Sequence, residues 1–257
     1  MSTSHSWLGK SCFVTGTASG IGLATTRLLI SLGADVYGID KVSEKDFRAN
    51  FPDLSKIHYF TCDLSQPNEI HKVFSEISHV PLSALFNIAA IPANGKSIVN
   101  MSVEEWDHFL AVNLRSIFLT TKNALPMFEL NSGGAIVNVS SVHAYATMKN
   151  HSAYAASKGG VNALTAELAL ELNPRNIRVV GVAPGSINTP MTTKNISDDK
   201  ELLESLGFST DGKSIAHVGQ PEEIAETLIW LASPSASFVN GTTLVADAGL
   251  LARLTSK

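Results

Sequence analysis

Short β-branched segments alternate with longer helical ones along the chain, and this alternation constrains the fold more than any other feature of the sequence. Several of the short segments are apolar at every position, as expected for parallel strands that are covered on both faces. Such an order is typical of an α/β fold with a doubly wound, mostly parallel sheet and helices on both faces. The seven segments that we expect to be strands are 11–15, 34–39, 57–61, 83–88, 135–140, 177–183 and 242–248.

The helical patterns have recognisable starting signals. Ser102 with Glu105 three residues later has the form of a capping box, and Pro221 suits the first position of a helix. No internal repeat, low-complexity tract or linker divides the chain, so residues 1–257 are predicted to form a single domain. The expected helices span 20–32, 67–77, 102–129, 152–173 and 221–232.

Charge and hydropathy exclude several classes of function. The formal net charge is −4 and the sequence pI is about 6.0, with lysines and arginines scattered rather than gathered in a stripe. We therefore expect no nucleic-acid partner. The sequence contains no run of about 18 apolar residues, and its first residues lack the basic start and apolar core of a secretion signal. We expect no association with membranes.

The cysteines indicate a reducing environment. Cys12 and Cys62 belong to expected strands that are separated by another strand, and two strand spacings of about 9.6 Å exceed the roughly 7 Å limit for a disulfide. Both are predicted to be free thiols, which suits the cytoplasm. The histidines show no zinc-like spacing with the cysteines, so we expect no metal site.

A glycine-rich turn, TGTASGIG at 15–22, follows the first expected strand and opens the first helix. Gly16 permits a tight turn, Gly20 lets the backbone approach a pyrophosphate, and Gly22 allows the helix to pack closely on the sheet. The helix N-terminus would then offer N–H groups to the phosphates. The pattern predicts a Rossmann-type dinucleotide site, although glycine can also serve the geometry of such a turn alone.

Asp40 ends the second expected strand, 18 residues after Gly22, where a carboxylate can accept both hydroxyls of the adenosine ribose. The same carboxylate would repel the 2′-phosphate of NADP. None of the residues 17–19 supplies a cation for that phosphate, and Lys41 is the basic residue close by. The sequence therefore predicts NAD as the cofactor, the alternative being that Asp40 only starts a loop or caps a helix.

Tyr154 and Lys158 share one face of an expected helix, because they are four residues apart. A phenol titrates near 10, and a neighbouring ammonium lowers that pKa towards a range useful for acid–base catalysis. The pair could also be a core aromatic beside a surface lysine. Ser141, at the end of the fifth expected strand, favours the catalytic interpretation because its hydroxyl can hydrogen-bond a substrate oxygen.

Over essentially its whole length, the sequence resembles the classical short-chain dehydrogenase/reductase family. The motifs that carry the resemblance occur in the family's order, and Ser141 precedes Tyr154 at its usual spacing. They are TGTASGIG (15–22), Asp40, CDL (62–64), NIAA (87–90), Asn113, VNVSS (137–141), YAASK (154–158) and PGSINT (184–189). The resemblance implies an NAD(H)-dependent enzyme that acts on CH–OH groups.

The resemblance also implies a role for each catalytic residue. Tyr154 would be the general acid/base, Lys158 would lower its pKa and hold the nicotinamide ribose, and Ser141 would orient the reacting oxygen. Asn113 would hold a water that links Lys158 to solvent. The cofactor would contact Gly16, Ser19, Gly20, Ile21, Gly22, Asp40, Asp63, Leu64, Asn87, Ala89, Tyr154, Lys158, Pro184, Gly185, Ile187 and Thr189, with Asp63 meeting the adenine, Asn87 bracing the central strands and Thr189 near the nicotinamide carboxamide or the phosphates.

The sequence departs from the family at 87–90, where the usual Asn-Asn-Ala-Gly is Asn87-Ile88-Ala89-Ala90. The second amide and the glycine are missing. Ala90 would restrict the backbone if that position required a positive φ. The cofactor contacts at 88–90 therefore remain open at this point.

The substrate is expected to be a secondary alcohol or its ketone. Polar groups near Ser141 and Tyr154 are expected to bind it. The candidates for substrate contact are Ser141, His143, Asn150, His151, Tyr154 and Ser186. They suit a sugar, polyol or hydroxy acid, although His143, Asn150 and His151 could each satisfy a turn, and Tyr145 and Met148 could floor an apolar pocket. A polar stretch at about 191–216 is predicted to close as a lid, or else is a solvated loop.

Other interpretations remain beside this one. A less polar ketone or a 3-oxoacyl group could be the substrate, and the fold could serve a catalytically silent nucleotide-binding protein or a structural one. We also expect a homotetramer, since the helices at 102–129 and 152–173 carry more apolar surface than one face against the sheet requires. The first presents Trp106, Phe109, Leu110, Phe118 and Met127, the second is rich in Ala and Gly, and the strand segment 242–251 offers a further contact. A monomer is the alternative.

Overall fold

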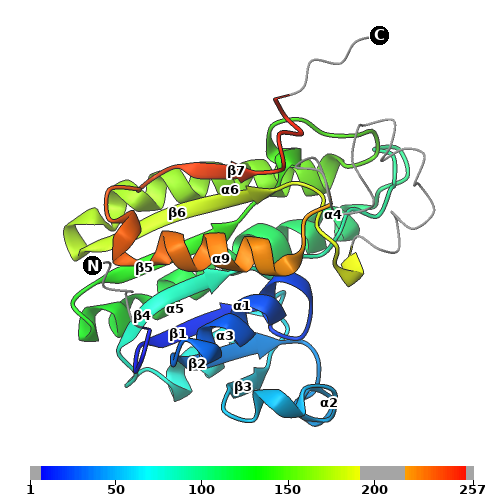
Figure 1. Ribbon diagram of the computed structural model, residues 1–257. Coiled ribbons are helices and arrows are strands. Elements are labelled where there is room, and N and C mark those ends of the chain that lie inside the picture. The colour runs from blue at the N-terminus through cyan, green and yellow to red at the C-terminus, as the bar shows by residue number, and fades with distance from the viewer. Residues whose placement is uncertain (1–6, 192–217, 253–257) are drawn as a thin grey trace.

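The computed structural model describes residues 7–191 and 218–252. In these residues seven strands form one sheet in the order β3-β2-β1-β4-β5-β6-β7, with every neighbouring pair parallel (Figure 1). The order reverses between β1 and β4, which creates the switch point where doubly wound sheets bind ligands. The strands are β1 (Ser11–Thr15), β2 (Asp35–Asp40), β3 (His58–Thr61), β4 (Leu82–Asn87), β5 (Gly134–Val139), β6 (Ile177–Pro184) and β7 (Thr243–Ala246).

Helices cover both faces of the sheet. The main ones are α1 (Gly20–Ser31), α2 (Glu44–Asn50), α3 (Pro67–Glu76), α4 (Val103–Leu110), α5 (Ser116–Leu130), α6 (Ser152–Glu171) and α9 (Pro221–Ala232). α1 and α9 pack against each other on one face, while α3, α5 and α6 contribute to the core on the other face (Figure 1). The predicted α/β fold with a doubly wound sheet is confirmed.

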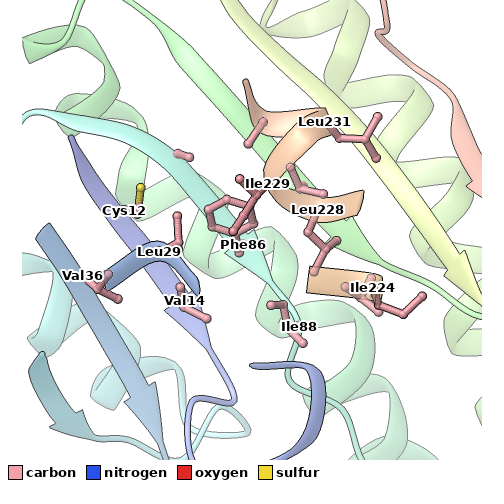
Figure 2. Close-up of a cluster of buried hydrophobic side chains, with 14 of the residues drawn as sticks. Cys12, Val14, Leu29, Val36, Phe86, Ile88, Ile224, Leu228, Ile229 and Leu231 are labelled. Atoms are coloured by element: carbon pink, nitrogen blue, oxygen red, sulfur yellow. The ribbon is translucent and has the colours of Figure 1, made fainter. Parts of the chain in front are cut away.

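Alternate residues of the central strands supply two separate cores. Cys12 and Val14 of β1 and Phe86 of β4 join Leu29 of α1 and Leu228 of α9 in the core of Figure 2. The residues between them in the strands point to the other face, where the ring of Phe13 stacks on that of Phe74, with centroids 4.5 Å apart. Burial on both faces explains why these strands read as continuous apolar runs.

The predicted strands and helices are present, with small differences at their ends, and two predictions about helices are wrong. α2 was not predicted, because it has seven residues and buries only Phe47, too little to give a helical period. The expected helix at 102–129 is interrupted by a π-helical turn at Ala111–Arg115, between α4 and α5. Hydrophobic periodicity cannot detect such a turn, because it inserts a single residue into an otherwise regular helix.

The predicted starting signals are confirmed. Ser102 and Glu105 form a reciprocal capping box at α4, and α9 begins at Pro221. The thiols of Cys12 and Cys62 are free and buried. Cys12 lies in β1 and Cys62 directly follows β3, with β2 between these two strands, and burial raises the pKa of Cys62 to about 12. In the part of the chain that the structure describes, no helix has the length and apolar character needed to cross a membrane.

The surfaces expected to form a subunit contact and a lid are only partly seen in the described residues. Phe109 and Met127 were expected to contribute to a subunit contact, but both are buried in the chain's own core, whereas Phe118 is 47% exposed. The long helix turns these two side chains inward because its π turn and its packing on α3 and α6 use more than one of its faces. The expected lid at 191–216 lies, apart from Met191, outside the described residues.

Candidate active site

Because the strands are parallel, their carboxyl ends meet at one edge of the sheet, and the sequence motifs gather there. The glycine turn follows β1, Asp40 ends β2, Asn87 ends β4, Ser141 follows β5 and Thr189 follows β6. These residues are far apart in the sequence. The fold brings them to the same edge, on both sides of the switch point between β1 and β4.

The glycine turn has no room for side chains at its key positions. A Cβ on Gly22 would lie 2.0 Å from the carbonyl oxygen of Gly16, and Gly16 itself has a φ of +77° with Ala89 directly beside it. A Cβ on Gly20 would meet the side chain of Thr189 at 3.0 Å. The turn is therefore a tight cradle between two backbone segments, with Ala89 on one side and Thr189 on the other.

The first turn of α1 offers polar groups at this cradle. The exposed Ser19 is the N-cap of α1, and its hydroxyl caps no N–H of the helix. Thr17, by contrast, is fully buried against Gly38 of β2, where a Cβ would lie 2.6 Å from its methyl group, so its hydroxyl is not presented at the cradle. A helix N-terminus with a free hydroxyl such as that of Ser19 beside it can bind phosphate oxygens.

Asp40 is fixed against the glycine turn. Its carboxylate accepts hydrogen bonds from the backbone N–H groups of Ala18 (3.0 Å) and Val42 (3.3 Å). The N–H of Cys62 donates to the Asp40 carbonyl at 2.8 Å, which brings the end of β3, and so Asp63, beside the end of β2. The carboxylate thus has a defined position at the edge where an adenosine ribose would lie, and the helix cap nearby is made by Ser43 instead.

The unusual segment at 87–90 is held by Thr15. The Thr15 hydroxyl accepts hydrogen bonds from the N–H groups of Ile88 (2.9 Å) and Ala89 (3.0 Å). Ala90 is not among the residues with positive φ. Alanine in place of glycine therefore introduces no backbone strain here, which resolves the question raised by the sequence.

A chain of buried polar side chains lies under this segment. The Asn87 amide donates to Asn138 of β5 at 2.9 Å and accepts from Thr120 of α5 at 2.7 Å. Asn138 in turn donates to Thr165 of α6 at 3.0 Å. Asn87 therefore joins two central strands and, through them, two helices, as its expected bracing position requires.

Ser141 and Tyr154 lie together at the end of β5. Ser141 accepts a hydrogen bond from the backbone N–H of His143 at 3.2 Å, so its own hydroxyl proton can be donated elsewhere. Burial raises the pKa of the Tyr154 phenol, and a hydrogen bond to Ser141 lowers it in part. The expected effect of Lys158 on this pKa stays a prediction.

Lys158 is buried beneath Tyr154. Its Nζ lies 5.8 Å from the centre of the Tyr154 ring and donates to the carbonyl of Val139 at 2.9 Å. Burial lowers the pKa of the Lys158 ammonium to about 8. The ammonium is therefore held in the interior, with its hydrogen bond directed to the end of β5.

Asn113 lies in the π turn and is fully buried. Its side-chain amide donates to the carbonyl of Ile91 (3.1 Å) and to the hydroxyl of Ser157 (3.3 Å), and its oxygen accepts from the N–H of Ile91 (2.8 Å). The side chain therefore clamps the segment after β4 to α6. A water held by Asn113 would need its backbone rather than its side chain.

The remaining cofactor candidates line the same edge. Leu64 and Ile187 are buried, while Asp63 is exposed and accepts from the N–H of Ser65. Gly185 packs so closely on Asp247 that a Cβ would lie 2.9 Å from it. Pro184 ends β6, and Ile21 and Gly22 belong to the first turn of α1.

Of the residues expected to contact the substrate, His143 and His151 lie beside Tyr154, whereas Asn150 and Ser186 serve the backbone. His143 and His151 stack on each other beside Tyr154, with ring centroids 4.9 Å apart. Asn150 is exposed and has a φ of +64°, so it serves the turn that positions His151. The Ser186 carbonyl accepts from Gly219, whereas Tyr145 and Met148 are more than half exposed and do not form a buried floor.

Several positioning residues were missed by the sequence analysis. Thr15 holds the segment at 88–89, Ser140 donates to the carbonyl of Lys158 at 3.0 Å, and Ser157 bonds both Asn113 and the carbonyl of Tyr154. Each lies beside a recognised motif. Their partners are distant in the sequence, so adjacency to a motif was the only available signal.

Comparison with known sequences gives matches over nearly the whole chain. A family model described as enoyl-(acyl carrier protein) reductase matches residues 16–251. The 3-oxoacyl-(acyl-carrier-protein) reductase FabG of Thermotoga maritima is 35% identical, over 95% of this chain and 98% of that protein. The 2,5-dichloro-2,5-cyclohexadiene-1,4-diol dehydrogenase of Sphingobium indicum is 33% identical, with the same coverage of both chains.

A solved structure agrees with these matches. A 4-hydroxyisoleucine dehydrogenase complexed with NADH superposes with a TM-score of 0.86 at 26% identity, covering 96% of this chain and 100% of that one. Together with the glycine turn, the parallel sheet and the Ser141, Tyr154 and Lys158 cluster, these similarities identify the relationship. The chain belongs to the short-chain dehydrogenase/reductase family of oxidoreductases.

Proposed function

We propose that the protein is an NAD-dependent dehydrogenase that interconverts a secondary alcohol and a ketone, with a small polar substrate such as a sugar, polyol or hydroxy acid. The observation that carries the proposal is the placement of Tyr154 and Ser141 over the buried Lys158 at the edge that also holds the glycine turn. An intact acid–base cluster beside a nucleotide cradle has no purpose in a silent or structural protein.

The residues present fit a nicotinamide dinucleotide. The side-chain-free cradle at Gly16, Gly20 and Gly22 suits a pyrophosphate, and Asp40 is held where it would accept the ribose hydroxyls. Asp63, Leu64, Asn87, Ala89 and the segment 184–189 would line the rest of the cofactor. When bound, the cofactor supplies the acceptor or donor of a hydride.

The chain's own residues handle the proton. Ser141, whose oxygen is occupied by the His143 N–H, would donate its hydroxyl proton to the reacting oxygen and orient it. Tyr154 would give a proton to that oxygen in reduction and take it in oxidation. Lys158 would hold the nicotinamide ribose, and its ammonium would lower the pKa of the Tyr154 phenol, which burial raises.

Asn113 would act beside this cluster. Its side chain fixes the position of Ile91 and of α6, and we propose that its backbone holds the water of a proton relay to Lys158.

We propose that the chain is a single domain whose segment 191–216 closes over the substrate. The two buried, free thiols support a reducing cytoplasm as its location.

Reduction of a 3-oxoacyl group or another less polar ketone is the second candidate, favoured by the identity to the Thermotoga maritima FabG. A panel of alcohols, polyols and 3-oxoacyl thioesters, with both cofactors, separates the two. Activity confined to a 3-oxoacyl thioester would replace the primary proposal, and it would leave the oxidoreductase class intact.

Cofactor choice tests the role of Asp40. The kcat/KM with NAD should exceed that with NADP, because the Asp40 carboxylate repels a 2′-phosphate. Asp40→Ser should reduce this preference by at least about tenfold, while Asp53→Ser, which removes an exposed carboxylate paired with Arg27, should leave it unchanged. Equal or better efficiency of the unmodified protein with NADP would contradict the prediction.

Replacement of Tyr154 tests the acid–base role. Tyr154→Phe should lower turnover by about 10²–10⁴-fold, the usual contribution of a positioned proton donor. NAD affinity, measured by fluorescence titration, should stay close to that of the unmodified protein. Tyr37→Phe, at the other end of the sheet, is the matched control. Normal turnover of Tyr154→Phe would show that another group transfers the proton.

The buried ammonium predicts a pH-dependent stability. The pKa of Lys158 is about 8 in the folded chain and 10.5 ordinarily, so below pH 8 the folded state bears the full cost of the buried charge. Between these values the unfolded state binds more protons, and the free energy of unfolding rises with pH. Lys158→Met should therefore stabilise the chain most at pH 7, by up to about 3 kcal/mol, and progressively less towards pH 10.

Urea denaturation at several pH values measures this difference. Lys72→Met removes an exposed lysine of α3 and should change stability little at any pH. A Lys158→Met protein that is less stable than the unmodified chain at pH 7, by an amount independent of pH, would contradict the assignment.

We also propose a homotetramer. Leu110, Leu114, Phe118, Gly160, Ala163 and Leu164 line a shallow apolar hollow between α4–α5 and α6. On the edge strand β7, Leu244 and Val245 are 40% and 37% exposed, and Phe238, which precedes this strand, is fully exposed. Each of these two surfaces can pair with the same surface of another copy across a two-fold axis, and two such contacts per chain give a tetramer.

Light scattering at micromolar concentration tests the assembly. The mass should be about four times the 27.3 kDa of one chain. Phe118→Glu should lower the measured mass, because a carboxylate would then be buried in the contact at the hollow between α4–α5 and α6. A mass near that of one chain for the unmodified protein would show that the proposal is wrong.

A further inference from the structure

Two histidine rings beside Tyr154 have no part in the mechanism above. The rings of His143 and His151 are nearly parallel, with an interplanar angle of 6° and centroids 4.9 Å apart. The His143 ring also packs edge-to-face against the ring of Tyr154, with centroids 5.6 Å apart and an interplanar angle of 80°. A substrate oxygen held by Ser141 and Tyr154 therefore has this pair as its neighbour.

The backbone fixes both rings relative to the catalytic residues. His143 follows Ser141 in a short 3₁₀ turn and donates its N–H to the Ser141 hydroxyl. His151 is the N-cap of α6, the helix that carries Tyr154, and its carbonyl accepts from Ala155 at 2.8 Å. The pair is thus tied to the two residues that hold the reacting oxygen.

Hydrogen bonds define which ring atoms are left for a ligand. Nδ1 of His151 lies 2.8 Å from the carbonyl of Lys149, and since a carbonyl only accepts, this nitrogen carries the proton. In this tautomer Nε2 of His151 has the lone pair. Nδ1 of His143 lies 2.9 Å from the Thr147 hydroxyl. Within residues 7–191 and 218–252, no hydrogen bond of the protein uses Nε2 of either ring.

The pair suits a neutral ligand group. Burial lowers the pKa of His143, and the neighbouring His151 lowers it further, which favours an uncharged His143 ring. Two parallel rings at this distance do not both hold an extra proton, because like charges would face each other. A carboxylate calls for a fixed cation, whereas a lone pair on Nε2 accepts the O–H of an alcohol.

We propose that the His143–His151 pair binds a second hydroxyl group of the substrate, which makes the substrate a small diol or polyol rather than a simple alcohol or a hydroxy acid. This inference rests on the proposed dehydrogenase function. Nε2 of His151 accepts the hydrogen bond from that hydroxyl, while the reacting oxygen lies at Ser141 and Tyr154. His143 supports the His151 ring by stacking and separates it from the phenol.

Three kinds of substrate with the same ring test the proposal: cyclohexanol, its 1,2- and 1,3-diols, and 2-hydroxycyclohexanecarboxylate, each with NAD. The unmodified protein should have its highest kcat/KM with one of the diols. His151→Phe keeps a flat ring but has no acceptor, so it should lower kcat/KM for that diol about tenfold, mainly through KM. Its kcat/KM for cyclohexanol should stay within about twofold, because no bond to the single hydroxyl is lost.

Two further variants separate recognition from structure. His151→Gln restores an acceptor oxygen and should keep part of the preference for the diol. His58→Phe is the matched control, since His58 stacks on Tyr37 in the same way, with centroids 4.5 Å apart, at the opposite edge of the sheet. Its kinetics should equal those of the unmodified protein.

The failures of the two proposals are distinguishable. Oxidation of cyclohexanol without any preference for a diol, an equal loss on both substrates in His151→Phe, or highest efficiency with the hydroxy acid would each overturn the inference and leave the dehydrogenase function standing. No reduction of NAD with any of these substrates or with the wider panel would overturn both.

Discussion

Two hydrogen bonds in opposite directions join the end of β5 to the catalytic helix, and the geometry of the site depends on them. Nζ of Lys158 donates to the carbonyl of Val139, and the hydroxyl of Ser140 donates to the carbonyl of Lys158. Together they set both the distance and the rotation of α6 relative to the strand. Because Tyr154 lies one helical turn before Lys158, its position beside Ser141 follows from the same pair of bonds. Burying an ammonium to form one of them reduces stability, and the fold retains it at the point where orientation matters most.

Buried polar groups play the same part across the whole centre of the sheet. Asn87 and Asn138 lie opposite each other on β4 and β5, and Asn113 fastens the backbone after β4 to α6. Apolar side chains of similar size would pack as well but would allow many orientations. A satisfied network in a low-dielectric interior permits only one. The strands and helices that carry the proton-transferring groups are thus aligned by hydrogen bonds, while apolar burial in the two cores supplies the bulk of the folding free energy.

The sequence predicted the architecture well, because the information needed for it is local. The central strands β1, β4, β5 and β6 are short apolar runs between turn residues, and burial on both faces makes them easy to find. The glycine turn and the Tyr154–Lys158 pair follow from spacing alone. What failed depends on tertiary contacts: α2 is too short to show a period, and Thr15, Ser140 and Ser157 act through partners distant in the sequence. Burial of Tyr154 raises the pKa of its phenol, and this burial depends on tertiary packing that the spacing to Lys158 does not reveal.

The π turn at Ala111–Arg115 has a consequence for the chain's tolerance to changes in length. Each residue of an α-helix advances the direction of its side chain by about 100°, so the extra residue in the turn resets the angular phase between α4 and α5. α4 can then face α6 while α5 faces α3 and the sheet, although the two helices are continuous. If the turn closed into a regular α-helix with all of its residues, one half would rotate by about 100° against the other and swing Phe109 or Met127 out of the interior. Deleting one residue within Ala111–Arg115 would instead give a regular helix and leave both halves in place. The turn is therefore the point in this helix where the loss of one residue can be absorbed, whereas a deletion elsewhere in α4 or α5 would shift the side chains that face the interior.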